Sequence, residues 1–390
     1  MMLRSRANTT SGQQDALTNN QESKGLGDKK RQATKEDHGL EPKPKRSALN
    51  DLSKAISNVV LNSNKKDSFQ KPDLRRAHPV TNLQTIAEAF KSVRSTSVRV
   101  VKETSTTYDF DKECSNDLTA NAIFANDIFN YLKSREPMFK VGDYMKKHDC
   151  ISHADRGTLG DWMIEVQESF ELYHETLYLA VKLTDLYLDR VDSVSKEKLQ
   201  LIGSAAIFIA SKFDERSPPL IEDFLYICND SYSREDLINM EMKFLRVVGF
   251  EALTAPLSYS FLRRYSRVIK GDMATLAAAR YVLETSLLWF DFARVSESKM
   301  AAASFLWALR VKKVGDWNAV LVKYSGYKVK DIEPLMYALN HMIHMRSKYL
   351  RDFNVVYEKY SNEVFYESSL LTPLPDIYRS TDPIRVPFDC

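Results

Sequence analysis

Glycine is scarce in this sequence, contributing only 12 of its 390 residues. Loops that cradle phosphate groups rely on glycine, because a side chain would hold the backbone away from the ligand. The sequence contains no Gly-x-Gly-x-x-Gly stretch, no Gly-Lys-Ser/Thr loop, no His-Arg-Asp loop and no Gly-x-Ser-x-Gly elbow. These absences argue against the common nucleotide-binding and hydrolytic centres. They favour an interaction module over an enzyme, and we expect no cofactor.

Cysteine and long apolar runs are also sparse. The four cysteines, Cys114, Cys150, Cys228 and Cys390, show no short paired spacing, so neither a disulfide framework nor a cysteine metal site is indicated. The longest apolar run, at 201–210, is about half the length of a bilayer span. The first residues lack the apolar core of a signal peptide. We therefore expect an intracellular protein that does not cross a membrane.

Charge and aromatic residues are unevenly distributed along the chain. The net charge is only +3, which does not indicate direct nucleic-acid binding by the chain as a whole. All four tryptophans lie at or after Trp162, whereas polar and charged residues dominate the first hundred positions. Such a segment cannot bury enough apolar surface to offset the entropy of ordering it. We predict a disordered regulatory tail over 1–115.

From about Asn116 the apolar residues recur with a helical period, and strand signals are nearly absent. A first helix is predicted over 116–136, ending before Pro137 because proline disrupts a helix interior. Two groups of five helices follow, so the sequence predicts an all-α protein. The predicted boundaries are 116–252 for the first helix and first unit, 253–350 for the second unit, and 351–390 for a C-terminal extension.

The two groups of helices look like an internal repeat. The stretch at 204–210 can be laid over the stretch at 302–308, a displacement of 98 positions (302 minus 204). Both carry small residues at helical spacing, which lets neighbouring helices approach closely. Alanine-rich helices are common, so composition alone offers an alternative explanation. The stretch at 176–188 is apolar nearly all round and is predicted to be the buried central helix of the first unit.

Glu171, His174 and Glu175 raise the question of a metal site. Glu-x-x-His places two ligands on one helical face, as in di-iron bundle proteins. Such a site requires a second Glu-x-x-His, and the sequence contains no other. The spacing therefore favours a solvent-exposed turn and helix start, where acidic residues interact well with the helix dipole. A helical di-metal oxidase is the least favoured alternative.

Two charged residues fall on apolar helical stripes. Lys212 shares a stripe with Ile202 and Ile209, and Glu241 shares one with Phe244. Charges on apolar faces are rarely left unpaired. They could pair within the molecule, or they could project from an apolar patch to bind a partner helix. The pattern alone does not decide between these alternatives.

Several motifs together resemble the cyclin family. RGTLGDWMIEV at 156–166 resembles the opening signature of the cyclin box, and ETLYLAVKLTDLYL, KLQLIGSAAIFIASKFDE and FLRRYSR continue the resemblance in order. The similarity covers about residues 116 to 370 and is greatest to the B-type mitotic cyclins, in their B-three subgroup. This resemblance implies tandem five-helix cyclin boxes that bind and activate a cyclin-dependent kinase of the mitotic type. A transcription or scaffold protein with the same fold is the alternative.

The resemblance also implies roles for individual residues. Lys212 and Glu241 match residues that hydrogen-bond the kinase. Arg156 and Asp185 match a buried structural ion pair, with Leu201 packing beside it. The positions that match the docking patch for Arg-x-Leu peptides are Leu159, Trp162, Glu165 and Gln200.

The docking patch departs from the family pattern at three positions. Asp155 stands where the family usually has methionine, Thr158 where it has isoleucine, and Gly160 where it has valine. An acid and a hydroxyl reduce the apolar area of a groove, which weakens a small peptide contact at about 25 cal/mol per Å². We therefore expect weakened peptide docking, but unaltered kinase activation.

The tail carries two further signals. A segment resembling the destruction box, through which B-type cyclins reach a ubiquitin ligase of the anaphase-promoting type, includes Arg46, Leu49, Asn50, Asp51 and Lys54. A basic cluster that resembles a nuclear import signal includes Lys43, Lys45 and Arg46. Solvated charge is the alternative explanation for both segments. We expect a nuclear protein with a cytoplasmic pool.

Overall fold

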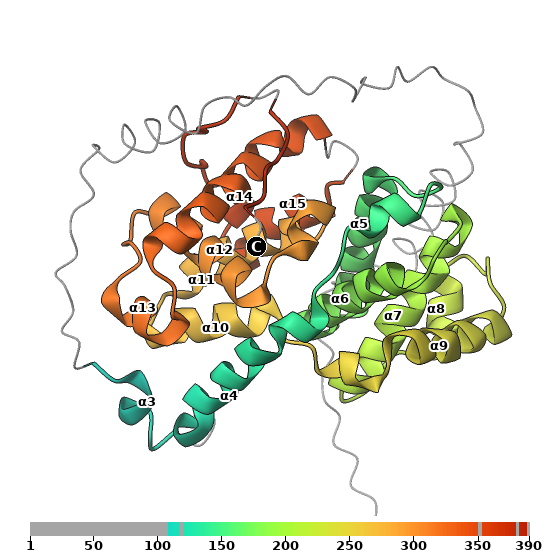
Figure 1. Ribbon diagram of the computed structural model, residues 1–390, viewed down its shortest axis with the longest axis horizontal. Helices are drawn as coiled ribbons and strands as arrows, with labels where there is room; N and C mark the ends of the chain where they lie inside the picture. Colours follow the sequence, from blue (N-terminus) through green and yellow to red (C-terminus); the bar gives the residue numbers. More distant parts are fainter. Residues whose placement is uncertain (1–107, 118–119, 350–352, 380–381, 388–390) are drawn as a thin grey trace, which may run out of the picture. The chain divides into compact units, whose positions relative to one another are not determined.

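The computed structural model of the protein describes residues 108–117, 120–349, 353–379 and 382–387. All of these described residues belong to a single compact body. Every regular element in these described ranges is helical (Figure 1), which confirms the predicted all-α class. None of the described helices combines the length and apolarity that a bilayer span requires.

The first unit contains five helices. They are α5 (His153–Ser169), α6 (His174–Arg190), α7 (Leu199–Asp214), α8 (Ile221–Ile227) and α9 (Arg234–Val248). Helix α9 begins where the sequence predicts, because the Ser233 hydroxyl accepts a hydrogen bond from the Asp236 backbone N–H at 3.1 Å. Such a cap satisfies a backbone donor that the helix itself cannot satisfy.

The second unit repeats this arrangement. Its helices are α10 (Ser258–Val268), α11 (Met273–Ser286), α12 (Glu297–Val311), α13 (Ala319–Ser325) and α14 (Val329–Tyr349). The aligned stretches at 204–210 and 302–308 lie in α7 and α12, the third helix of each unit. The predicted tandem repeat is therefore confirmed.

Small residues bring the helices of each unit close together. In α12, Ala301, Ala302 and Ala303 are fully buried, and this helix contacts α10, α11 and α14. In α7, a Cβ atom on Gly203 would lie 2.7 Å from the Leu159 Cδ1 atom of α5. Glycine at this position therefore allows α5 to pack directly on α7. Helix α6 is buried along most of its length, as predicted for the centre of the first unit.

The predicted first helix is α4 (Ala122–Arg135), which ends two residues before Pro137, as expected. The chain then continues as the 3₁₀ helix η3 (Glu136–Phe139). The C-terminal end of α4 is attached to the second unit. Lys133 Nζ donates to the Ser325 carbonyl at 2.8 Å, and the Glu136 carboxylate accepts the Ser298 backbone N–H at 2.6 Å.

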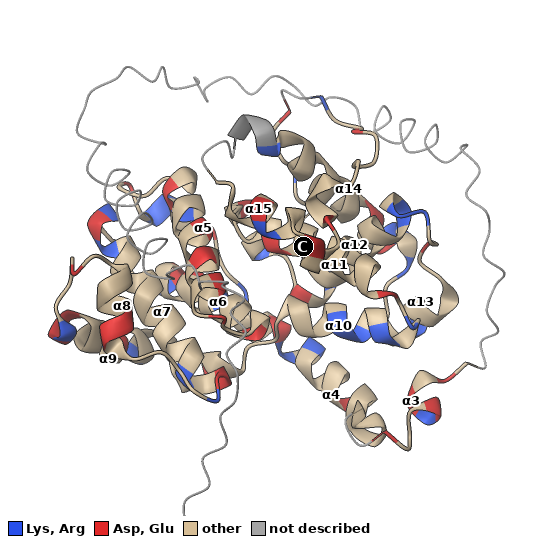
Figure 2. Cartoon of the chain, turned by 180° about the vertical axis from the view of Figure 1, so that it is seen from behind, with Lys and Arg blue, Asp and Glu red and all other residues tan. Residues whose placement is uncertain are grey.

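The structure corrects the predicted extent of the tail, because residues 108–115 are part of the folded body. Helix α3 (Phe110–Glu113) packs on the second unit, and Phe110 is only 6% exposed. Asp111 pairs with the nearly buried Arg264 at 2.5 Å, and the Tyr324 hydroxyl accepts the Phe110 N–H at 2.8 Å. Figure 2 shows the charged residues of α3 and α10. Composition missed this segment because one aromatic anchor and one buried ion pair are enough to hold it.

The C-terminal extension is also ordered where it is described. It contains α15 (Val355–Ser361) and the 3₁₀ helices η8 (Glu363–Phe365) and η9 (Ser368–Leu370). Helix α15 contacts α5 of the first unit and α11 of the second (Figure 1). The extension is therefore built into both units.

Candidate functional site

Lys212 and Glu241 form an ion pair at the surface of the first unit. Lys212 lies in the last turn of α7, and its ammonium donates to Glu241 Oε1 on α9. The same ammonium lies 4.0 Å from the centre of the Phe208 ring. The side chains of Lys212 and Glu241 remain 40% and 17% exposed. Of the two alternatives left open by the sequence, internal pairing occurs, while the pair stays accessible to a partner.

Exposed large apolar side chains occur on the helices of this ion pair and directly after them. Phe213 and Met242 directly follow the two charged residues, and Phe250 lies in η6 (Phe250–Thr254), which follows α9. They are 49%, 44% and 72% exposed. Exposed apolar side chains that gather in one region mark interaction surfaces, whereas single ones need no explanation.

Helix α4 extends this apolar surface. Phe124, Ile128 and Tyr131 lie on one helical face at i, i+4 and i+7, and each is more than 40% exposed. Arg135, on the same face, donates to the Thr254 hydroxyl at 2.9 Å and pairs with Glu251, so this face lies beside η6. We call the combined region the α4–α9 surface. It consists of Phe124, Ile128, Tyr131, Lys212, Phe213, Glu241, Met242 and Phe250.

Sequence reasoning found the two charges of the α4–α9 surface but missed its apolar residues. An apolar stripe on a helix normally faces the core, whereas Ala125 is the buried residue of α4. The available signal was a second apolar face on α4, because Ala125, Phe129 and Leu132 already supply the face that packs on the core.

The predicted docking patch is largely closed. Leu159 and Trp162 are only 6% and 5% exposed, because α5 packs on α7 at Gly203. Glu165 and Gln200 are partly exposed. Asp155, one of the departures from the family pattern, caps α5 by accepting the Ser152 backbone N–H at 2.9 Å. It also pairs with Lys196 at 2.7 Å, so its carboxylate is engaged within the protein.

Glu165 lines an open acidic pocket between α5 and the C-terminal extension. Glu168 and Glu358 share the pocket, and Figure 2 shows acidic residues on both α5 and α15. Burial, followed by the charges of Glu168 and Glu358, raises the pKa of Glu165 to about 7. Burial and the Glu165 charge raise the pKa of Asp161 likewise to about 7. Carboxylates crowded together in this way resist ionisation.

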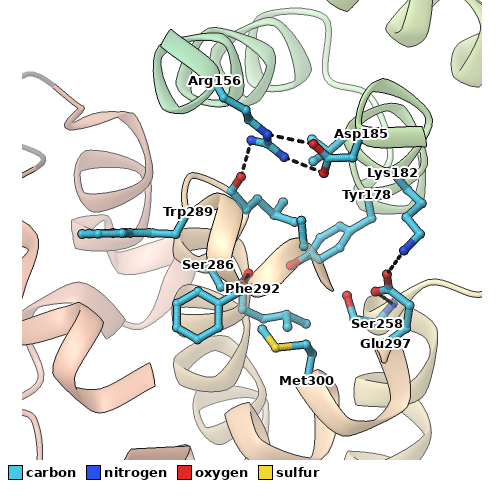
Figure 3. A pocket seen from close by; sticks show the side chains of 14 residues that line it. Arg156, Tyr178, Lys182, Asp185, Ser258, Ser286, Trp289, Phe292, Glu297 and Met300 are labelled. Atoms are coloured by element: carbon cyan, nitrogen blue, oxygen red, sulfur yellow. Dashed lines mark hydrogen bonds and ion pairs between the residues drawn. The ribbon is translucent and has the colours of Figure 1, made fainter. Parts of the chain in front are cut away.

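Arg156 and Asp185 form a buried ion pair where the two units meet. The Arg156 guanidinium donates to both Asp185 oxygens at 2.9 and 2.8 Å, and to the Leu287 carbonyl of the second unit at 2.6 Å (Figure 3). The Tyr144 hydroxyl donates to Asp185 at 2.6 Å. Nearby, Lys182 and Glu297 pair across the units at 3.0 Å. The adjacent cavity of about 40 Å³ is far smaller than a typical ligand pocket.

The turn between α5 and α6 is only partly as predicted. Glu171 is exposed and adopts a φ of 54°, as expected for a turn. The His174 side chain is only 21% exposed, because its ring packs against Tyr259 and its Nε2 accepts a hydrogen bond from Arg280. Burial lowers the pKa of His174 to about 4, so the imidazole is neutral at physiological pH. Glu175 pairs with Arg263 at 2.8 Å. Within the described residues, no cluster of three metal-ligating side chains occurs.

The predicted degron and nuclear import cluster lie outside the described residues. Both remain predictions from the sequence.

The family model "Cyclin, N-terminal domain" matches residues 127–253, and "Cyclin, C-terminal domain" matches residues 256–374. The second match extends past the predicted end of the second unit at 350 and includes α15.

Relatives from several animals share this similarity. The chain is 42% identical over 348 residues to "G2/mitotic-specific cyclin-B3" of Gallus gallus, covering 85% of each chain. It is 43% identical to the protein of that name from Caenorhabditis elegans, over 70% of this chain and 72% of the relative. For Drosophila melanogaster the identity is 46%, over 66% of this chain and 45% of the relative. A viral cyclin from herpesvirus saimiri has a similar fold, with a TM-score of 0.51 at 23% identity, covering 58% of this chain and 100% of that chain.

The first prediction concerns the buried ion pair. Replacing Arg156 by Met leaves the Asp185 carboxylate buried without a cation, which costs about 3–5 kcal/mol. We expect thermal unfolding to show a Tm lowered by about 10 °C. Tyr144→Phe removes one hydrogen bond to the same carboxylate and should cost only about 1–2 kcal/mol. Equal losses in the two variants would contradict a dominant role for the charge.

The second prediction concerns pH. Because the folded-state pKa of Glu165 is raised to about 7, the folded protein holds this proton from about pH 4.5 to 7. The stability contributed by the protonated form is lost as pH rises through 7. Glu165→Gln should therefore raise Tm at pH 8 by about 3 °C, allowing for solvent screening, and leave it unchanged at pH 4. Glu171→Gln, on the exposed turn, is the control. A gain at pH 4 as large as that at pH 8 would refute the pKa assignment.

Proposed function

Because the chain belongs to the cyclin family, within its mitotic B-type branch and the cyclin-B3 group, we propose that it binds and activates a cyclin-dependent protein kinase of the mitotic type. The observation that carries this proposal is the α4–α9 surface, in which exposed apolar residues flank an accessible ion pair. We propose that this surface contacts the kinase and that the chain itself supplies no catalytic group.

The proposed mechanism is a shift in population. A kinase transfers phosphate only when a glutamate on its mobile helix pairs with the lysine that holds the ATP phosphates. A rigid surface that packs against this helix in its active position binds the active state more tightly than the inactive one. Binding then favours the active state by the difference between the two affinities.

The charged pair and the apolar residues have separable roles in this mechanism. Phe250 and Phe213 offer apolar area that is desolvated on binding, and such aromatic anchors supply most of the affinity at interfaces. Lys212 and Glu241 already satisfy each other, so they can orient toward kinase backbone groups without leaving a bare charge in the interface. The ion pair would then select the position of the partner helix rather than add much affinity.

The third prediction tests this surface with purified protein and a mitotic cyclin-dependent kinase. Phe250→Ala should weaken binding by about 2 kcal/mol, or about 30-fold in Kd, because it removes a large exposed ring from the interface. Lys212→Ala should also weaken binding. Affinity is measured by calorimetry, and kinase activation by phosphate transfer to a histone substrate.

The matched control is Val364→Ala, because Val364 in η8 is 76% exposed but lies in the C-terminal extension. Circular dichroism should show an unchanged helical content in all three variants. Wild-type affinity of both Phe250→Ala and Lys212→Ala would place the kinase on another surface.

We propose further that the segment 46–54 is a destruction box recognised by a ubiquitin ligase of the anaphase-promoting type. Support comes from its resemblance to the degron of B-type cyclins, with Arg46 and Leu49 at the spacing Arg-x-x-Leu. Lysines nearby, at 54, 65, 66 and 71, offer sites for ubiquitin attachment.

The fourth prediction concerns this degron. Arg46→Ala with Leu49→Ala should keep the protein present after anaphase, because the ligase loses both anchoring side chains. The measurement is the decay of the protein after release of cells from mitotic arrest. Leu74→Ala with Arg75→Ala is the control and should decay normally. Normal decay of the first variant would rule out this degron.

We also propose that the basic residues at 43–46 direct import into the nucleus. The support is their resemblance to nuclear import signals, with Lys43, Lys45 and Arg46 in four consecutive positions. Arg46 belongs to both proposed signals. Localisation is therefore followed in a variant that changes only Lys43 and Lys45 and leaves Arg46 in place.

A further inference from the structure

We infer that α15 is a positioning element that sets the orientation of the two cyclin boxes, through a buried charge that all three parts share. The boxes are the first unit, α5–α9, and the second unit, α10–α14. The structural part of this inference is independent of the proposed function, and its consequence for the kinase rests on that function.

The shared charge is the ammonium of Lys359 on α15, and its partner in the second box is the carboxylate of Glu284 on α11, which is fully buried. Lys359 of α15 places its ammonium 2.5 Å from Glu284 Oε1, and the Tyr360 hydroxyl donates to Oε2 at 2.7 Å. Burial by itself raises the pKa of Glu284, but the charge of Lys359 and the hydrogen bonds outweigh it and lower the pKa. Glu284 is therefore ionised, and α15 supplies its counter-ion.

The same ammonium reaches the first box. Lys359 Nζ donates to Gln167 Oε1 of α5 at 2.8 Å, and the Gln167 amide in turn donates to the Leu172 carbonyl at 2.5 Å. Gln167 and Lys359 are 6% and 5% exposed. One cation thus binds an acceptor from each box at a site closed to solvent.

The chain after α15 is fastened as well, to α14 of the second box. The Asn340 side chain donates to the Leu374 carbonyl at 2.9 Å and accepts the Leu374 N–H at 3.0 Å. His341 Nδ1 lies 2.8 Å from the Asp376 carboxylate. The extension is thus fixed both at α15, by Lys359, and further along the chain, by the contacts of Leu374 and Asp376 with α14. Helix α15 is therefore held in place between the two boxes.

These contacts make detachment of α15 unfavourable. If α15 left the joint, the buried Glu284 carboxylate would lose both the Lys359 ammonium and the Tyr360 hydroxyl, and Gln167 would lose its donor. Uncompensated charges of this kind are strongly disfavoured. The two boxes should therefore hold one mutual orientation as long as Lys359 is in place.

A purely local role for α15, as a cover on the second box, gives a different expectation. In that case the bond from Lys359 to Gln167 would be incidental, and the orientation of the boxes would depend on the other contacts between them. These include Arg156 with the Leu287 carbonyl and Lys182 with Glu297. The two possibilities differ in the distance distribution between the boxes.

The fifth prediction measures that distribution in the full chain. Nitroxide labels are attached after Lys243→Cys in α9 and Lys330→Cys in α14, both exposed positions, with the four native cysteines changed to serine. Double electron–electron resonance then reports the distance between the boxes. The test variant combines Lys359→Met with Glu284→Gln, which removes the link without leaving a buried charge.

We expect a single narrow distribution for the unaltered joint, and a distribution at least twice as wide for the double variant. Tyr360→Phe keeps the ion pair and should remain narrow. Gln167→Leu removes the bond from Lys359 to the first box, together with the local bond from the Gln167 amide to the Leu172 carbonyl, and should widen the distribution. Lys359→Arg keeps a cation at this position and should retain the narrow form. If the double variant and Gln167→Leu both keep the narrow distribution of the unaltered joint, the inference is overturned.

Kinase activation is measured in parallel on the same variants. We expect Gln167→Leu to reduce the maximal activated rate more than it reduces affinity for the kinase, because every side chain of the α4–α9 surface is kept while the mutual orientation of the two boxes becomes less fixed. If the unaltered chain activates no cyclin-dependent kinase, the proposed function fails. The distance measurement still decides the role of α15 in that case.

Discussion

Buried charge is the constraint on which this architecture depends. Asp185 and Glu284 are carboxylates with almost no exposure to solvent, and each lies beside a cation from a different helix. An ion pair of this kind adds little net stability compared with a well-packed apolar pair, but separating it is costly. Its main effect is therefore to favour one arrangement of the helices, because any arrangement that separates the two charges is disfavoured.

Both pairs are located where the two boxes meet. Arg156 holds Asp185 within the first box and donates to the Leu287 carbonyl of the second, while Lys359 holds Glu284 and reaches Gln167. Small residues in α7 and α12 let the helices of each box pack closely, and a close-packed interior is stiff. The charges extend this stiffness across the joint. A protein that acts by favouring one shape of a partner needs such stiffness, because a compliant surface would adapt to the inactive partner as readily as to the active one.

The fold could be predicted from the sequence because helical periodicity is a property of neighbouring residues. The tandem repeat could be predicted because the two similar stretches, 98 positions apart, can be laid over each other directly. Helix boundaries followed from local chemistry, as with the Ser233 cap and the end of α4 before Pro137. The order of residues 108–115 could not be predicted in this way, since it depends on Arg264 and Tyr324, more than 150 positions away. The burial of His174 was missed for the same reason, because Tyr259 and Arg280 cover it from the second box.

The candidate site shows a different limit. Lys212 and Glu241 were noticed because a charge on an apolar stripe is anomalous, whereas Phe250 and Ile128 look like ordinary core residues in the sequence. A sequence pattern indicates that an apolar residue will be buried. It does not indicate whether the residue is buried within its own chain or against a partner. In α4 the difference arises because its end is fastened by Lys133, Arg135 and Glu136, and these polar contacts leave the apolar face outward. The exposed surface is thus a consequence of how the polar residues anchor the helix, and burial of the apolar face is left to a partner.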